Sequence, residues 1–275
     1  RGYRRLQEVI GGYKRLRIKR YNFFIVLTVV VTIAISGVLW ARQQYVAPII
    51  MYHRIDDKSK VSSLSVCPEN FHRQIEFLKI HNYNVVKLEE LPDLMKKRKL
   101  PRRTIAITFD DGYENNYTCA YPVLKEFGIP ATIFIVPALV GTEGYLTWDQ
   151  IVEMSESGVI SIGSHTMTHA WLSDLPEQKL DIEIFDSKRA IEGHLRKKVH
   201  SFSYPLGGFN SHVRDKVIKA GYRIAVATNP GKKYPKHDLF AMKRLRISKT
   251  SDNLLVFWIE ISGFYTWIKE HRDED

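Results

Sequence analysis

Short apolar segments alternate with amphipathic segments of helical period from residue 48 almost to the C-terminus. This alternation restricts the fold more than any other feature, because strands separated by helices form parallel sheets whose faces the helices cover. No repeat or low-complexity linker interrupts it. The pattern predicts one α/β domain, an irregular (β/α) barrel of about seven strands. The expected strands are 48–53, 84–88, 105–109, 131–136, 159–163, 201–204, 222–228 and 242–247.

The expected helices follow from apolar residues that recur every three to four positions. Pro68 suits the first turn of a helix over 68–81 that places Phe71, Ile75 and Leu78 on one face. A longer amphipathic helix begins at Pro176. The other helices are expected at 89–97, at 119–127, from 148 onward, at 211–220 and at 252–270.

The basic charge of the chain lies mostly at its N-terminus. The formal net charge is +11, and residues 1–20 hold eight Lys/Arg and one Glu. The remaining 255 residues carry 33 basic and 29 acidic side chains, which is too small an excess for a nucleic-acid-binding surface without a basic stripe. We therefore expect no nucleic-acid partner.

An uncharged segment of eighteen residues, Phe23–Trp40, follows the basic one. As a helix it would be about 27 Å long, close to the roughly 30 Å of a bilayer's hydrocarbon core. Basic residues precede it and only Arg42 follows it closely, so the positive-inside rule places the N-terminus in the cytoplasm. A cleaved signal peptide is the alternative, but Leu39-Trp40-Ala41 is a poor cleavage site.

The expected organisation follows from these two segments. The sequence predicts a single-pass membrane protein whose α/β domain lies on the extracellular or periplasmic side. The expected parts are a basic cytoplasmic segment at 1–20, a transmembrane anchor at 21–41, a tether at 42–47 and the α/β domain at 48–275.

Two adjacent carboxylates follow an apolar strand. Ile105 to Phe109 reads as a strand buried on both faces, and Asp110 and Asp111 follow it directly before Gly112. Neighbouring carboxylates are costly to desolvate unless a metal ion or a cation compensates their charge. A simple Asp-Asp-Gly turn after the strand is the alternative interpretation.

Three histidines also follow predicted strands. His53 ends the first strand, and His165 and His169 follow the strand at 159–163. In a barrel of parallel strands these ends meet on one face. Two histidines and one carboxylate form a ligand set that leaves metal positions open for water and substrate. A His-x-x-x-His pair in a loop can also be merely structural.

Two motifs resemble those of a known family, the polysaccharide deacetylases of the NodB type, carbohydrate esterase family 4. Thr108-Phe-Asp-Asp-Gly-Tyr113 is similar to the first motif of the family and Ser164-His-Thr-Met-Thr-His169 to the second, and Tyr145-Leu-Thr-Trp148 is also typical of it. The resemblance covers about residues 48–247. It implies that Asp110 is the general base and that Asp111, His165 and His169 hold one divalent metal ion. Zinc is the expected ion, with cobalt, nickel and iron as alternatives.

The third motif departs from the pattern of the family. The family has Arg-x-Pro-Tyr-Gly where this chain has Ser203-Tyr-Pro-Leu-Gly207. The oxyanion donor implied by the resemblance is a backbone N–H, which Leu206 can supply. The arginine that would orient Asp110 is absent, and Arg244 and Arg246 are both candidates to replace it. Further expected substrate contacts are Tyr204, Pro205 and Trp148, with Phe209 as a second aromatic wall.

The general acid is expected at an unusual place. The family's C-terminal Leu-x-His motif is absent, but deacetylases of poly-β-1,6-N-acetylglucosamine carry the acid histidine after the first strand, as Tyr52-His53 does here. The alternative is a strand-end histidine that only bonds a backbone carbonyl.

The resemblance implies metal-dependent hydrolysis of N-acetyl groups from an N-acetylglucosamine-containing extracellular polysaccharide, with release of acetate. The alternatives are an esterase or deacylase that acts on O-acetyl groups or a lipid-linked sugar, and an inactive glycan-binding protein. The expected partners are an acetylated glycan and the membrane. Cys67 and Cys119 are expected to be free, and the sequence does not determine the oligomeric state.

Overall fold

A computed structural model describes residues 2, 21–38, 40, 45–56, 64–96, 100–230, 233–234 and 237–265. The chain divides into two compact units, 1–45 and 46–275. The predicted basic segment, apart from Gly2, lies outside the described residues, as do residues 42–44 of the predicted tether and the end of the helix expected at 252–270.

The first unit contains one apolar helix, Tyr21–Val38, none of which is buried. Its two threonines bond within the helix, since the hydroxyl groups of Thr28 and Thr32 donate to the carbonyl groups four residues earlier, each at 2.8 Å. The helix is long and apolar enough to cross a membrane, although a signal sequence shares this length and composition.

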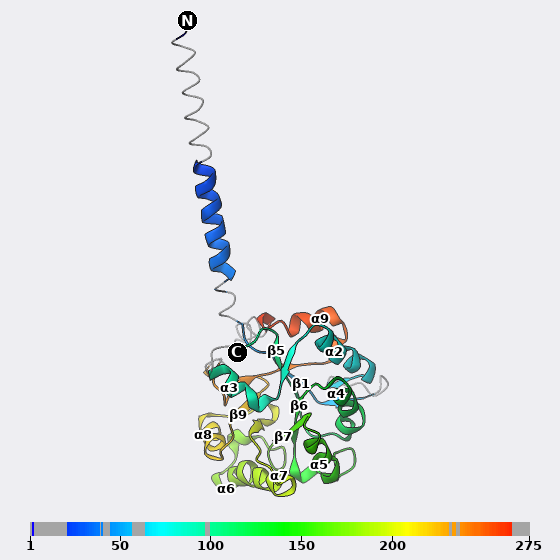
Figure 1. Cartoon of the computed structure of the whole chain (residues 1–275). Helices are drawn as coiled ribbons and strands as arrows, with labels where there is room; N and C mark the ends of the chain where they lie inside the picture. The colour runs from blue at the N-terminus through cyan, green and yellow to red at the C-terminus, as the bar shows by residue number, and fades with distance from the viewer. Residues whose placement is uncertain are drawn as a thin grey trace. The chain divides into compact units, whose positions relative to one another are not determined.

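The second unit is built on a parallel sheet that forms a nearly closed barrel, as the sequence predicts (Figure 1). Eight strands pair in the order β10-β9-β8-β7-β6-β5-β1-β11, and β4 pairs with β5 beside this path. The strands are β1 (Ile49–Tyr52), β4 (Asn84–Val86), β5 (Thr104–Phe109), β6 (Ala131–Ile135), β7 (Ile160–Ser164), β8 (Ser201–Ser203), β9 (Ile224–Ala227), β10 (Met242–Lys243) and β11 (Leu245–Arg246). Two short strands, β2 (Arg54–Ile55) and β3 (Ser65–Val66), form a separate pair.

One segment closes the barrel. The single strand expected at 242–247 is in fact two short strands separated by Arg244. β10 pairs with β9 and β11 pairs with β1, so the sheet begins and ends on this segment. The first half of this five-residue segment is parallel to β9 and the second half is parallel to β1. The chain must therefore step from one neighbour to the other, and this step interrupts the strand at Arg244.

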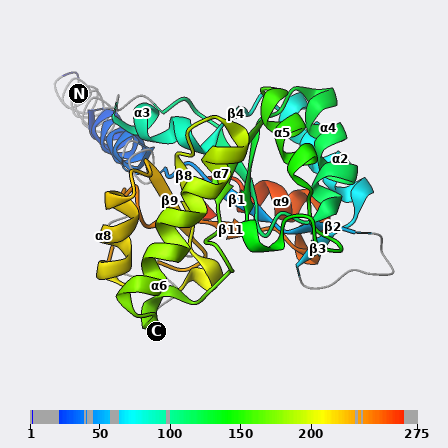
Figure 2. The same cartoon turned by 90° about the horizontal axis from the view of Figure 1, so that it is seen from below.

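Helices surround the sheet (Figure 2). They are α2 (Pro68–Ile80), α3 (Leu91–Lys96), α4 (Tyr121–Phe127), α5 (Trp148–Glu156), α6 (Glu177–Asp181), α7 (Ser187–Leu195), α8 (Ser211–Lys219) and α9 (Leu254–Glu260). Two π-helical turns, Asn116–Ala120 and Ile182–Asp186, precede α4 and α7. Short 3-10 turns cover Leu88–Glu90, Pro137–Leu139, Leu172–Asp174, Pro205–Gly207 and Lys249–Asp252.

The helix expected at 252–270 is interrupted within its described part. α9 ends at Glu260, Gly263 follows in the left-handed region with φ 79°, and residues 264–265 are helical again. A glycine adopts this conformation at little cost, so it is a common place for a helix to stop.

Side chains of the strands alternate between two apolar clusters. Ile105, Ile107 and Phe109 belong to a cluster that also contains the buried residues of the surrounding helices. Ala106 belongs to a second cluster with residues of β1, β6, β9 and β10, which fills the inside of the barrel. Because side chains along a strand alternate in direction, Asp110 continues the inward series of Ala106 and Thr108. Cys67 and Cys119 are both free.

Candidate active site

The acid pair lies at the carboxyl end of β5. The Asp110 amide donates to the Tyr52 carbonyl of β1 at 3.0 Å, which continues the sheet one residue beyond the strand. Asp111 and Gly112 then take left-handed φ values of 72° and 71°. A Cβ at Gly112 would lie 3.1 Å from Ile135 Cγ2. Glycine is therefore favoured both by the backbone conformation and by the close approach of β6.

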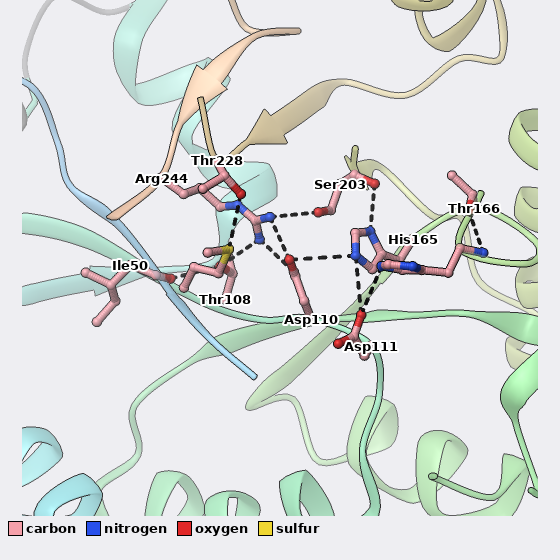
Figure 3. A network of polar contacts seen from close by, with 11 residues as sticks. Ile50, Thr108, Asp110, Asp111, His165, Thr166, Ser203, Thr228 and Arg244 are labelled. Carbon is pink, nitrogen blue, oxygen red and sulfur yellow. Dashed lines mark hydrogen bonds and ion pairs between the residues drawn. The ribbon is translucent and has the colours of Figure 1, made fainter. Parts of the chain in front are cut away.

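Asp111, His165 and His169 converge at one point. Asp111 Oδ1 lies 3.5 Å from His165 Nε2 and 3.4 Å from His169 Nε2, and one ligand atom of each residue lies within 4.8 Å of the others. Figure 3 shows the carboxylate of Asp111 facing the imidazole of His165. The predicted grouping of these three residues is therefore present in the fold.

The donor set fits a divalent metal ion. His165 Nδ1 lies 2.8 Å from the Ser203 carbonyl and must carry the proton in that hydrogen bond, so the Nε2 lone pair is free to face the cluster. Burial lowers the pKa of His165, which favours the neutral form that binds metals. Ligands of a tetrahedral ion at about 2.1 Å lie roughly 3.4 Å apart, close to the separations here.

A buried carboxylate that sequence reasoning missed holds the histidine loop. Glu183 is 6% exposed and accepts hydrogen bonds from the amides of Met167 and Thr168 at 2.9 Å and from the Thr168 hydroxyl at 2.6 Å. His169 has a left-handed φ of 64°. Glu183 lies in the π-helical turn before α7, where an extra residue displaces the side chain from the regular helical series. Helical periodicity alone therefore gave no signal for it.

Asp110 forms a buried ion pair with Arg244. Asp110 is 3% exposed and Arg244 is 2% exposed. Arg244 Nη1 donates to Asp110 Oδ1 at 2.6 Å, and Nη2 donates to Asp110 Oδ2 at 2.7 Å. Arg244 also donates to the Ser203 hydroxyl at 2.8 Å and to that of Thr108 at 3.3 Å (Figure 3). Ser203 stands where the family motif has arginine. Of the two candidates from the sequence, Arg244 thus occupies the place of the missing cation.

The pair fixes the charge of Asp110. Burial by itself would raise the pKa of this carboxyl, but the charge and hydrogen bonds of the adjacent Arg244 guanidinium hold the pKa well below its usual range. Each carboxylate oxygen uses one lone pair for Arg244, so a second one remains on each. Asp110 is therefore an ionised carboxylate with acceptor capacity directed at the cluster, since its Oδ2 lies 3.7 Å from His165 Nε2.

His53 lies beside the acid pair at the same edge of the sheet. Tyr52 of β1 pairs with Phe109 of β5, so His53 and Asp110 follow neighbouring strands at the same level. Burial lowers the pKa of His53, while the charges of Asp110 and Asp111 raise it. Its buried Nδ1 has no hydrogen-bond partner among the described residues. His53 thus follows β1 next to Asp110, and its role as the general acid stays a prediction.

The third-motif segment forms a tight turn. Leu206 and Gly207 have left-handed φ values of 56° and 75°, and the Leu206 side chain is 72% exposed. Pro205 is buried. Tyr204 is fully buried, stacks on Phe209 with ring centroids 4.1 Å apart, and donates its hydroxyl to the Phe240 carbonyl at 3.0 Å. The side chain of Tyr204 is thus part of the core, and a contact between Tyr204 and substrate stays a prediction.

Trp148 lies in the first turn of α5. Its ring stacks on that of His194 in α7, with centroids 3.8 Å apart and an interplanar angle of 9°. Its observed role is to join two helices of the outer layer. A contact between Trp148 and substrate stays a prediction.

Comparisons with known proteins identify the family of this chain. The family model described as polysaccharide deacetylase matches residues 97–225. This range includes Asp110 and the three residues of the cluster. The putative polysaccharide deacetylase YxkH of Bacillus subtilis (strain 168) is 36% identical over 202 residues, covering 73% of this chain and 71% of that protein. A poly-beta-1,6-N-acetyl-D-glucosamine N-deacetylase of Staphylococcus aureus (strain MRSA252) is 29% identical over 220 residues, covering 75% of each.

A solved structure shares the fold. The deacetylase PplD of Streptococcus pyogenes, solved in complex with acetate, superposes with a TM-score of 0.71 at 28% identity. The match covers 77% of this chain and 98% of that one. The motifs, the barrel and the relatives agree, and the chain belongs to the polysaccharide deacetylase family.

Proposed function

We propose that this protein is a metal-dependent N-deacetylase that hydrolyses N-acetyl groups of an N-acetylglucosamine-containing extracellular polysaccharide and releases acetate. The observation that carries the proposal is the convergence of Asp111, His165 and His169 beside the ion-paired Asp110. The relative named for poly-β-1,6-N-acetyl-D-glucosamine supports a glucosamine polymer as the substrate.

Asp111, His165 and His169 would hold one divalent ion, with zinc as the first candidate. When bound, such an ion lowers the pKa of a water molecule and polarises the acetamide carbonyl. Glu183 fixes the loop between the two histidines, and the Ser203 carbonyl fixes the ring of His165. These contacts hold the nitrogen lone pairs in place before the ion arrives.

Asp110 accepts the proton of the attacking water. The oxygen of that water bonds to the acetyl carbon, and Arg244 keeps the carboxylate ionised and fixed in orientation. The backbone N–H of Leu206 donates to the acetyl oxygen as negative charge develops on it. His53 gives a proton to the nitrogen as the carbon–nitrogen bond breaks, which leaves acetate and a free amine.

The proposal includes a membrane anchor at 21–41 with the catalytic domain outside the cytoplasm. The apolar helix Tyr21–Val38 and the basic residues before it support this topology. Extraction of membranes with alkaline carbonate should leave the full chain in the membrane fraction, and recovery of that chain in the soluble fraction would contradict the anchor.

Acetate release from defined oligosaccharides tests the proposed function. The full-length chain in detergent, freed of metal with a chelator and reloaded with zinc, cobalt or nickel, should release acetate from N-acetylglucosamine oligomers only after reloading. Oligomers with β-1,6 and β-1,4 linkages identify the polymer. Release from O-acetylated sugars alone would replace the proposal with an esterase, and no release from any of them would remove it.

His53→Ala should lower kcat/KM by about 10²-fold, near the lower end for general acid–base catalysis, because solvent can partly replace a proton donor at the mouth. The protonated form is required, so the wild-type rate should fall as the pH rises through the pKa of His53. That fall should be absent in the variant. His237→Ala, in the loop after β9, is the control and should match the wild type. Equal kinetics for both variants would remove His53 as the acid.

A further inference from the structure

An exposed tryptophan lies beside the candidate active site. Trp171 is 45% exposed and follows His169 by two residues, so their Cα atoms are at most about 7.6 Å apart. It stands just before the short 3-10 turn Leu172–Asp174, in the same loop that carries the two histidines. The mechanism above gives this side chain no role.

The indole ring rests directly on the backbone of Gly208. A Cβ built at Gly208 would lie 2.3 Å from Trp171 Cζ3 and 2.4 Å from Cε3. Gly208 has φ −81° and ψ 106°, an extended conformation that any residue can adopt. The glycine is therefore required by the contact and not by the backbone. It leaves space for the ring to lie against the third-motif segment.

A second contact ties the same two loops. Asn210 Nδ2 donates to the Ser173 carbonyl at 3.3 Å, and Asn210 Oδ1 accepts from the Val213 amide at 3.0 Å in the first turn of α8. The loop after β7 is thereby joined to the loop after β8. Trp171 is held between the ligand His169 and the turn that contains Leu206, with part of its ring in contact with Gly208 and nearly half of its surface open.

The open part of the Trp171 ring and the exposed Leu206 side chain, which lie on the two joined loops, are together called the apolar rim. Leu206 is 72% exposed and lies two residues before Gly208. Aromatic side chains in binding sites supply a large, rigid apolar surface, and sites are lined mainly by such groups with a few polar ones that set orientation. Because Trp171 follows His169 by two residues and its ring rests on Gly208 of the third-motif segment, the group expected on its open face is the part of the substrate that extends beyond the reacting acetamide.

We propose that Trp171 is a stacking platform for the sugar ring next to the one that loses its acetyl group. This rests on the proposed function. In a β-linked N-acetylglucosamine chain the ring substituents are equatorial, so the axial C–H bonds make an apolar face that can lie on an indole. The platform has no charge of its own, which suits a neutral, still acetylated polymer. A single sugar in the site does not reach it.

The prediction is a dependence on substrate length. The full-length chain in detergent, loaded with zinc, should show kcat/KM rising from the disaccharide to the pentasaccharide of N-acetylglucosamine. Trp171→Ala should lower kcat/KM on the pentasaccharide by about tenfold, mainly through KM, and should lower it less on shorter substrates. Trp171→Phe should recover most of the loss, and Gly208→Ala should reproduce it by displacing the ring.

Trp258→Ala is the matched control. Trp258 lies on α9 and is 49% exposed, close to the exposure of Trp171, so its removal tests for general effects of losing a surface tryptophan. It should match the wild type at every length. Equal losses for the two alanine variants, or a loss in Trp171→Ala that is the same at all lengths, would overturn the platform and leave the proposed function intact.

A measurement of oligosaccharide binding distinguishes failure of the platform from failure of the proposed function. If the wild type releases no acetate from any oligomer, the proposed function fails, and calorimetric titration of the pentasaccharide into wild type and Trp171→Ala still decides the platform. Tighter binding by the wild type supports it, and equal binding overturns it. Sedimentation at several protein concentrations tests whether a second copy of the chain binds to the rim. If the wild type self-associates and Trp171→Ala does not, the rim is an interface between two copies and not a sugar-binding surface.

Discussion

Asp110→Asn should abolish turnover, with a loss of up to about 10⁴-fold in kcat, while the protein keeps its metal. Asparagine keeps an oxygen that can accept from Arg244, so the side chain can stay in place, but an amide cannot take a proton from water at neutral pH. Acetate release measures the first effect. Elemental analysis of the metal after dialysis measures the second.

The neighbouring acid provides the control. Asp111→Asn removes a proposed ligand whose oxygen lies 3.4 and 3.5 Å from the two histidine nitrogen atoms, so metal and activity should be lost together. If instead Asp110→Asn loses its metal and Asp111→Asn retains it, the roles of the two aspartates must be exchanged.

Arg244→Met should destabilise the folded protein by about 3 kcal/mol or more at neutral pH. The substitution leaves the Asp110 carboxylate buried without its cation, and removal of one partner of a buried ion pair typically costs about 3–5 kcal/mol. Denaturant unfolding of the full chain measures this. The acidic limb of the kcat/KM profile should also move to higher pH, because Arg244 lowers the pKa of Asp110 and the reaction needs the ionised carboxylate.

Arg246→Met is the control for this variant. Arg246 lies two residues away, is exposed on β11, and belongs to the same closing segment of the barrel. Its loss should leave both the unfolding free energy and the acidic limb of the kcat/KM profile near those of the wild type. Similar effects from the two substitutions would mean that the closing segment, and not the ion pair, is what Arg244→Met disturbs.

The elements with the strongest local signals were predicted well. β5 is apolar at nearly every position and ends in an Asp-Asp-Gly turn, and α2 begins at Pro68 as expected. The predictions were wrong for two elements near the C-terminus. The strand expected at 242–247 splits at Arg244 because its two halves pair with different strands, and α9 ends at Glu260, before Gly263.

The ligand cluster was predictable because its parts are local. Asp110 and Asp111 follow one strand, and His165 and His169 follow another, so their presence at strand ends can be read from short motifs. Glu183 could not be found in this way. It reaches the histidine loop from a π-helical turn, and an inserted residue of this kind shifts which side chains face inward without any compositional sign.

The sequence by itself determined the barrel class and the residues of the cluster, because hydrophobic period and short motifs are properties of neighbouring residues. It left two arginines equally open as partners of Asp110. The choice required the tertiary structure, because the ion pair joins residues 134 positions apart. The step from β10 to β11 directs Arg244 into the barrel and leaves Arg246 exposed. This direction depends on which strands the two halves pair with, and a local sequence pattern does not predict that pairing.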